Sequence, residues 1–431
     1  MAGEWREVAL ASVAVISSGK RPARVLKEAA SDCQIPVIGG GGPSGYTDSA
    51  LYDGGVLITG RVGTLGKLFA PTGPCWPSDN ALVVRPNNAE TDPRFLRYAL
   101  QHVIGEAAGM NRGAANPLIT QGDLGRLRIG HPPLAEQIAI AHILGTLDDK
   151  IELNRRMSET LEAMARALFK SWFVDFDPVR AKMEGRLPAS AGQAGWQRGQ
   201  SLPGLPAHLY DLFPARLVDS ELGEIPEGWE CGTFGDVVEQ LRETETPLES
   251  PDVVFHHFSI PAYDEGQWPI QEAGESIKSL KSRVPAGAVL LSKLNPEIER
   301  VWLVDVQPEA RAICSTEFLV LVPRPPHGRS YVYCLARSPS FRQELEGLVT
   351  GTSKSHQRAQ ASAILALRVI RPPDPLLKRF EQAAEPILAR TLECRRESRT
   401  LAALRDALLP KLISGELRVR DAERFLKERG L

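Results

Sequence analysis

The sequence predicts an α+β protein built from two mixed α/β domains, each followed by a long helix. The two helices are expected to pack antiparallel as a coiled-coil spacer, relating the two halves by pseudo-two-fold symmetry. Three observations support this fold: two long helical patterns at residues 132–176 and 372–415, a constant separation between them, and a similar order of short strands before each. A repeat of this length determines the architecture more firmly than any single motif does.

The first long helical pattern contains a seam in which apolar and small residues recur at alternating steps of four and three. This heptad-like spacing is typical of a helix that packs lengthwise against another helix. Its flank carries oppositely charged pairs such as Glu152 and Arg156, which predicts exposure to solvent. The residues expected to pair the two helices are Leu147, Ile151, Leu161, Leu168, Trp172, Ile387, Leu401, Leu408 and Leu412.

The second helical pattern repeats the first at a separation of 240 residues, as Pro132 with Pro372 and Trp172 with Leu412 illustrate. Its seam is less apolar, because polar residues such as Arg405 occupy it, so it would pair poorly with a copy of itself. The first helix is therefore its expected partner. Two unrelated amphipathic helices are the alternative, and a constant separation over about forty residues argues against them.

Both helical patterns contain a signal for an interruption at matching positions. Thr146 and Asp149 resemble a capping box, and Pro386 stands where the second pattern matches Thr146. We expect each region to form either a short helix followed by a long one or a single kinked helix.

Composition limits the number of domains and the classes of protein that are compatible with the chain. With 431 residues the chain is expected to hold two or three domains, and its 51 basic and 53 acidic residues mean that nucleic-acid binding would need local basic patches. Its six cysteines include no Cys-x-x-Cys pair, which indicates reduced thiols and neither a disulfide framework nor a zinc site. Neither a signal-like N-terminus nor a run of about eighteen apolar residues occurs, so a soluble, cytoplasmic protein is expected.

The two domains repeat one order of predicted elements. Trp229 matches Trp5 at a separation of 224 residues, and Gly287 matches Gly55 at 232 residues. Since the separation grows along the chain while the order of elements holds, the second domain is expected to carry extra surface loops.

A helix and a polar loop close each repeated pattern. Asp92 is expected to cap a helix in the first domain, and residues 109–116 form the loop after it. In the second domain, residues 338–349 are expected to match this helix, and residues 350–358 are expected to match the loop.

A motif search identifies no catalytic and no metal-binding constellation. Gly39–Gly42 lacks the lysine of a phosphate-binding loop and is interpreted as a flexible loop, and Gly60–Lys67 has the wrong spacing for such a loop. Asn295–Glu297 lacks the second proline and the aromatic residue of an amino-methyltransferase motif. His256 and His257 have no ligand partner at helical spacing and are expected on a strand or on the surface.

Polar and basic residues on loops of the two domains remain as candidates for DNA binding. Arg and Lys neutralise phosphates, while Arg, Asn, Gln, Ser and His can recognise base edges. Any one of them alone is more often an ordinary solvated side chain, but the two polar loops occupy equivalent positions. The candidates are Lys20, Arg21, Arg24, Arg61, Lys67, Asn111, Arg112, Asn116, Lys278, Lys281, Arg283, Lys293, Lys354, Ser355, His356 and Arg358.

Several longer motifs suggest a family. They are Glu136–Ala139, Leu147–Asn154, Leu168–Val179, Gly223–Trp229 and Leu409–Leu417. In these motifs the chain resembles the specificity (S) subunit of a type I restriction-modification system, and the run Leu168–Val179 is the most specific of them.

The resemblance implies an organisation into six segments. They are target recognition domain 1 (1–131), a central conserved helical region (132–176), a linker (177–222), target recognition domain 2 (223–371), a distal conserved helical region (372–415) and a charged C-terminal tail (416–431).

The resemblance also implies a non-catalytic subunit, in which each recognition domain recognises one half of a bipartite DNA target. Partner subunits would carry out adenine-N6 methylation and ATP-dependent cleavage. The implied partners are double-stranded DNA, two modification (methyltransferase) subunits and restriction (motor-nuclease) subunits, which would bring S-adenosylmethionine, ATP and Mg2+. A protein scaffold and a stand-alone DNA enzyme with an unrecognised site remain as alternatives.

Overall fold

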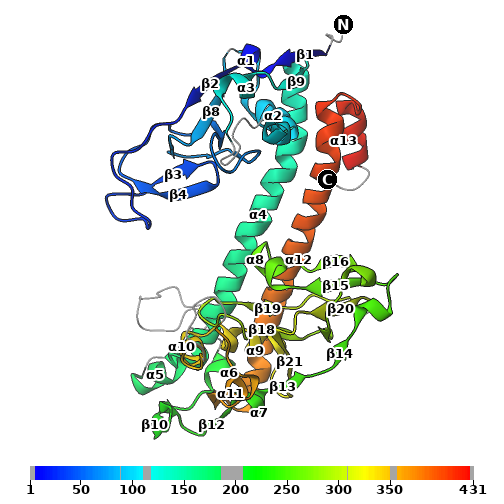
Figure 1. Ribbon diagram of the computed structural model, residues 1–431. Helices are drawn as coiled ribbons and strands as arrows, with labels where there is room; N and C mark the ends of the chain where they lie inside the picture. The colour runs from blue at the N-terminus through cyan, green and yellow to red at the C-terminus, as the bar shows by residue number, and fades with distance from the viewer. Residues whose placement is uncertain are drawn as a thin grey trace. The chain divides into compact units, whose positions relative to one another are not determined.

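The computed structural model divides the chain into two compact units, one formed by Met1–Asn154 with Arg396–Leu431 and the other by Arg155–Arg395. Each unit contains one mixed domain and part of two long helices, α4 (Leu134–Phe173) and α12 (Asp374–Ile413), drawn in Figure 1. The structure describes residues 5–87, 89–109, 118–185, 207–307, 309–349 and 357–427.

The first domain consists of short antiparallel strands with small helices. A four-stranded sheet has the order β2 (Ala14–Ser18), β8 (Ala81–Pro86), β5 (Leu57–Gly60) and β6 (Leu68–Phe69). A three-stranded sheet has the order β4 (Gly42–Thr47), β3 (Ile35–Gly39) and β7 (Trp76–Pro77). The ends of the domain pair through β1 (Arg6–Ala9) and β9 (Arg128–His131), and its helices are α1 (Leu10–Val13), α2 (Pro93–Gly109) and α3 (Gln121–Gly125).

The second domain repeats this plan. Its four-stranded sheet has the order β13 (Val238–Leu241), β21 (Phe318–Pro323), β18 (Val289–Ser292) and β19 (Val301–Leu303). Its second sheet has the order β14 (Thr244–Glu245), β17 (Lys281–Arg283), β20 (Arg311–Cys314), β15 (Val254–Phe258) and β16 (Ile270–Ala273). The closing pair is β12 (Glu230–Thr233) with β22 (Arg368–Arg371), and the α-helices are α7 (Phe234–Val237), α8 (Ile260–Asp264), α9 (Arg329–Ala336), α10 (Pro339–Gly347) and α11 (Ala361–Leu365).

The sheets of the two domains correspond strand by strand. β3 pairs antiparallel with β4 and parallel with β7, and β15 pairs antiparallel with β16 and parallel with β20. The second domain adds β14 and β17 beside β20, so its extra length includes ordered edge strands as well as the loops that the sequence predicts. The repeated order of elements is therefore confirmed.

One predicted correspondence between helices is only partly right. Residues 338–349 are predicted to match the helix after Asp92, yet α9 follows β21 directly, as α2 follows β8. The first domain has one helix here, α2, whereas the second domain has two, α9 and α10. Pro339 begins α10 because a proline cannot continue the preceding helix. The start of α2 therefore corresponds to α9, and its end corresponds to α10.

The predicted division of each region into a short helix and a long one is wrong, since α4 and α12 are each a single helix of 40 residues. The alternative of a single kinked helix stays a prediction. The Thr146 hydroxyl donates a hydrogen bond to the His142 carbonyl at 2.8 Å, the bond of a helix interior and not of a cap. Leu144 and Leu147 flank this point and are both buried. In α12, Pro386 lies two residues before the buried Leu388. Packing of the apolar stripe thus outweighs the local preference for a break.

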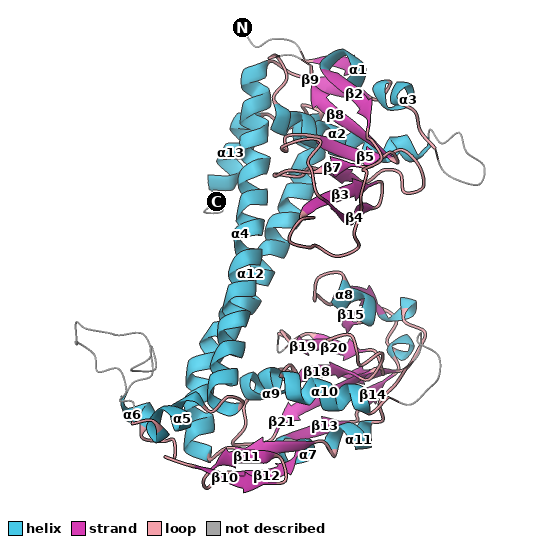
Figure 2. Cartoon of the chain, turned by 90° about the vertical axis from the view of Figure 1, so that its left-hand side faces the viewer, coloured by secondary structure: helices cyan, strands magenta, loops and turns pink. Residues whose placement is uncertain are grey.

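The two long helices pack antiparallel in each unit, as predicted, and Figure 2 shows them side by side. In the first unit, Arg405 contacts Asp148 at 2.7 Å, and Asn154 contacts Glu397 at 2.9 Å. Since the residue number falls along α12 as it rises along α4, the helices run in opposite directions. In the second unit, the Ser158 hydroxyl lies 3.5 Å from a backbone oxygen of α12.

The residues of the predicted seam lie in the cores of the two units. Leu147, Ile151, Leu401, Leu408 and Leu412 pack in the apolar core of the first unit. Leu168, Trp172 and Ile387 pack in the core of the second unit, and Leu161 is half-buried. Asn154 and Thr391 are fully buried polar residues between these apolar positions.

The segment 177–222 is expected as a linker, but its described parts are structured. It contains α5 (Asp177–Met183), α6 (Ala207–Tyr210) and β10 (Leu217–Ser220), which pairs with β11 (Gly223–Pro226). Val179 and Phe213 are buried in the core of the second unit, so this part of the chain completes that core.

The charged tail contains the helix α13 (Val419–Lys427). Ala422 of this helix is fully buried against the core of the first unit. None of the helices described is long and apolar enough to cross a membrane.

Candidate nucleic-acid interface

Three chain segments of the first domain meet at the end of β5. The Arg61 N–H donates to the Asn80 carbonyl at 2.9 Å, and the Arg61 carbonyl accepts from the Ile119 N–H at 3.0 Å. Val62 forms a β-bridge with Leu118, the first described residue after the polar loop. We call this meeting point the loop junction.

The second domain has the same loop junction at the end of β18. The Lys293 N–H donates to the Glu317 carbonyl at 2.8 Å, and the Lys293 carbonyl accepts from the Ala359 N–H at 3.1 Å. Leu294 forms a β-bridge with Arg358, just after the second polar loop. The backbone of the two domains is therefore alike at the place where three loops meet.

A left-handed residue follows the junction in both domains. Gly63 has φ 81° and Asn295 has φ 48°, and they occupy matching positions. Asparagine is the residue other than glycine that adopts this conformation most readily. Asn295 is thus a turn residue, in agreement with the rejection of a methyltransferase motif there.

A polar hollow lies beside the junction of the first domain. Its lining includes the glycines at the β3–β4 turn and the side chains of Arg21, Ser44, Thr64 and Asn80. A Cβ placed on Gly40 would lie 2.8 Å from the Cα of Gly60, so only glycine permits this approach. The run Gly39–Gly42 is therefore a tight, packed hairpin turn, and its interpretation as a flexible loop is wrong.

Both junctions contain a cation, Arg61 or Lys293, and the junction of the second domain adds a charged pair. The guanidinium of Arg358 donates two hydrogen bonds to the Glu317 carboxylate, at 2.6 and 3.1 Å, and its side chain is 54% exposed. Lys293 is half-buried beside them. At the matching positions the first domain has the uncharged Asn80 and Leu118. One backbone frame thus presents two different sets of polar groups.

Other candidates are engaged by neighbouring acidic or hydroxyl groups. Arg24 forms an ion pair with Asp32 at 2.6 Å, and Arg283 contacts Glu245 at 3.1 Å. The ammonium group of Lys281 donates to Ser279. The two ion pairs partly neutralise Arg24 and Arg283, which weakens the case for phosphate binding by these arginines.

The remaining described candidates differ in their surroundings. Lys20 directly precedes Arg21, which lines the hollow. The side chain of Lys20 is exposed, and its carbonyl accepts a hydrogen bond from the Trp76 indole at 2.7 Å. Lys67 and Lys278 are exposed. The candidates outside the described residues are Asn111, Arg112, Asn116, Lys354, Ser355 and His356.

Sequence reasoning missed two members of the junction, Asn80 and Glu317. A shared signal could have found them, because each stands two residues after a serine and directly before an apolar strand. That serine donates its N–H to a strand of the second sheet in both domains, Ser78 to Ile38 of β3 at 2.9 Å and Ser315 to Phe258 of β15 at 3.0 Å.

The two histidines on β15 form local pairs. Nδ1 of His257 lies 2.6 Å from Glu272, and burial lowers the pKa of His257 despite that carboxylate. Nε2 of His256 lies 3.2 Å from the Gln271 amide. Across the described ranges, no three His, Cys, Asp or Glu side chains gather as a metal site requires.

The fold and the repeated junction define a class of two-module recognition proteins, in which two matched domains are carried on one pair of antiparallel helices. A family model described as the type I restriction modification DNA specificity domain matches residues 2–163. The specificity subunit of the type I restriction enzyme HindI from Haemophilus influenzae is 28% identical over 382 residues, which covers 79% of this chain and 81% of that subunit.

Other relatives agree with this match. The MjaIX specificity subunit from Methanocaldococcus jannaschii is 25% identical over 338 residues, covering 72% of this chain and 65% of that subunit. The crystal structure of a type I restriction-modification S subunit from M. genitalium superposes with a TM-score of 0.59 at 14% identity, over 95% of this chain and 96% of that one, and it supports the fold. Over most of its length the chain is thus similar to specificity subunits of type I restriction enzymes, and its first part matches the model of their DNA specificity domain.

The most specific sequence motif of the resemblance has a structural role. Trp172, Phe173 and Phe176 form an aromatic cluster with Trp229 and Phe380, with ring centroids 5.2 to 6.1 Å apart. The cluster joins the end of α4, the start of α12 and the second domain inside one unit. The motif therefore identifies the attachment of a domain to the helices and not a DNA contact.

Proposed function

We propose that this chain is the non-catalytic DNA-recognition subunit of a type I restriction-modification complex, with each domain recognising one half of a bipartite, asymmetric target. One observation supports this most directly: the two domains present different polar side chains on the same loop junction. A rigid frame with variable loop residues is the usual arrangement of a recognition site.

The chemistry of the two junctions favours different bases. Arg358, braced by Glu317, offers a fixed pair of donors that matches the two acceptors on the major-groove edge of guanine. Asn80 offers one donor and one acceptor, which match adenine. Two half-sites of different sequence follow from two junctions of different composition.

The paired helices would act as the spacer between the half-sites. A helix of 40 residues spans about 60 Å at 1.5 Å per residue, compared with about 34 Å for one turn of duplex DNA. A spacer of this length suits two half-sites separated by a fixed gap.

Catalysis would belong to partner subunits. Two modification subunits would bind S-adenosylmethionine and methylate adenine at N6, and restriction subunits would use ATP and Mg2+ for cleavage. Because the chain is nearly neutral, these partners would supply much of the phosphate contact.

Mapping of methylated adenines in a host that expresses the chain with its modification subunit tests the proposal. We expect Arg358→Ala to relax one position of one half-site, with about tenfold weaker discrimination for a loss of ~1.4 kcal/mol. The matched control is Arg283→Ala, since Arg283 is 53% exposed and also paired with a glutamate, yet lies outside the junction. An unchanged motif in Arg358→Ala, or an equal change in the control, would contradict the assignment of the junction.

A further inference from the structure

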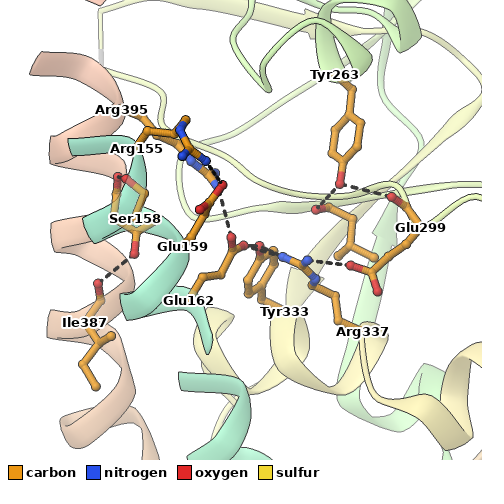
Figure 3. Close-up of polar contacts among 12 residues, drawn as sticks. Arg155, Ser158, Glu159, Glu162, Tyr263, Glu299, Tyr333, Arg337, Ile387 and Arg395 are labelled. Carbon is orange, nitrogen blue, oxygen red and sulfur yellow. Dashed lines mark hydrogen bonds and ion pairs between the residues drawn. The ribbon is translucent and has the colours of Figure 1, made fainter. Parts of the chain in front are cut away.

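Glu162 of α4 is a point at which three elements of the second unit meet (Figure 3). Its carboxylate accepts hydrogen bonds from the Tyr333 hydroxyl of α9, from Arg337 at the end of α9, and from Arg395 of α12 at 3.1 Å. Glu162 is only 14% exposed and Arg395 only 18%. One carboxylate therefore ties the second domain to both long helices.

Arg337 extends this cluster to Glu299, two residues before β19. Its guanidinium also contacts Glu299 at 2.5 Å, and the Tyr263 hydroxyl donates to the Glu299 carbonyl at 3.3 Å. Burial lowers the pKa of Arg337, but the carboxylates of Glu162 and Glu299 outweigh burial and raise it, so the guanidinium stays charged. Arg166 of α4 also lies 3.9 Å from Glu299, so three guanidinium groups surround the two carboxylates.

Directional contacts of this kind restrict the position of a domain more than apolar packing does. Apolar side chains tolerate small shifts, whereas a hydrogen bond is lost outside a donor–acceptor range of about 2.7–3.2 Å. A change of one base pair in the gap moves a half-site by about 3.4 Å and turns it by about 35°. A domain held by Glu162 cannot follow such a shift without leaving a buried charge unpaired, which is costly.

We infer that Glu162 is a positioning residue that fixes the second domain on the paired helices and thereby restricts the target to one gap length. Tyr333, Arg337 and Arg395 are its partners in this role. The inference rests on the proposed function, because a gap exists only if two domains recognise two half-sites.

The test compares methylated sites for the wild-type chain and for Glu162→Gln and Tyr333→Phe, each expressed with the modification subunit. We expect both half-site sequences to be kept. Methylation at sites whose gap is one base pair shorter or longer should rise about tenfold, the discrimination that one charge-assisted hydrogen bond supplies. Tyr333→Phe removes a single hydroxyl, so it serves as the variant least able to disturb folding.

Glu159→Gln is the matched control, since Glu159 lies one turn away on α4, is 64% exposed and pairs with Arg155. It should keep a single gap. A single gap in both Glu162→Gln and Tyr333→Phe, with or without a lower total methylation, would overturn the inference. Absence of any bipartite motif for the wild-type chain would instead overturn the proposed function, so the two failures are distinguishable.

Discussion

The two units attach their domains to the same helices by clusters that match in plan but differ in composition. In the first unit, the Tyr98 hydroxyl of α2 donates to Asp148 of α4 at 2.7 Å, and Arg405 of α12 contacts the same carboxylate at 2.7 Å. In the second unit, Tyr333 and Arg395 contact Glu162. In both cases α4 supplies the acid, α12 supplies the arginine and the domain supplies a tyrosine.

The difference lies in how far each cluster extends. Arg97, the further cation of the first cluster, is 42% exposed and lies 3.4 Å from Asp148, whereas Arg337 of the second is 10% exposed. Arg405 has a second acid in Asp406, at 2.7 Å. Burial, followed by the hydrogen bond to Asp148, raises the pKa of Tyr98, so its hydroxyl stays a donor. We conclude that the second domain is held by the more buried and more connected cluster.

The largest expected effect comes from a substitution in the aromatic core of the second unit, the unit that contains the Glu162 cluster. Phe380 is fully buried against Phe173 and Trp172, and its counterpart in the first unit is Ile140, which is 1% exposed. We expect Phe380→Ala to cost ~4 kcal/mol and Ile140→Ala ~3 kcal/mol, since a larger ring leaves a larger cavity. Urea unfolding followed by tryptophan fluorescence measures both values, and a greater loss for Ile140→Ala would reverse the comparison.

The two carboxylates provide the next test. We expect Glu162→Gln to lower the free energy of unfolding by about 2 kcal/mol and Asp148→Asn by about 1 kcal/mol, because a charge-assisted hydrogen bond contributes about 1.5–3 kcal/mol. Asp148→Asn is the milder change since Arg405 keeps Asp406. Chemical denaturation of the purified chain checks this order, and equal losses would show that the clusters are equivalent.

The last test, with effects no larger than those of the carboxylates, concerns the glycines that follow helices in the two units. Gly415 after α12 has φ 77°, and a Cβ there would lie 3.2 Å from the Trp5 ring, whereas Gly185 after α5 has φ 69° with nothing within 4 Å. We expect Gly185→Ala to cost about 1 kcal/mol for the left-handed conformation alone. Gly415→Ala should cost about 1 kcal/mol more, because a contact of 3.2 Å forces the ring to move. Thermal unfolding of both variants tests this. An equal loss of stability in the two variants would show that the contact with Trp5 adds nothing to the cost of Gly415→Ala.

The sequence predicts the repeated domains and the antiparallel helices because both depend on periodicity over many residues. It fails at Thr146 and Pro386, where local capping signals are outweighed by burial of the apolar stripe on either side. It also cannot predict the Glu162 cluster, whose members Tyr333 and Arg395 are far apart in the chain and look like ordinary surface residues.

The candidate site likewise contains residues that the sequence predicts and residues that it does not. Arg61 and Lys293 are predicted from the sequence and directly follow matched strands. Asn80 and Glu317 are not predicted, although both stand two residues after a serine, and backbone hydrogen bonds bring them to the junction. Candidates such as Arg24 and Arg283 lose weight because acidic partners engage them, Asp32 of the same loop and Glu245 of β14.

The central claim is that two different domains recognise two different half-sites at one fixed gap. The most direct measurement is a map of methylated adenines before and after residues 223–371 are replaced by the second domain of a type I specificity subunit to which the chain is similar. The account predicts a bipartite motif in which one half-site changes while the other half-site and the attachment through α4 and α12 remain. Replacement of both half-sites, or of neither, would contradict it.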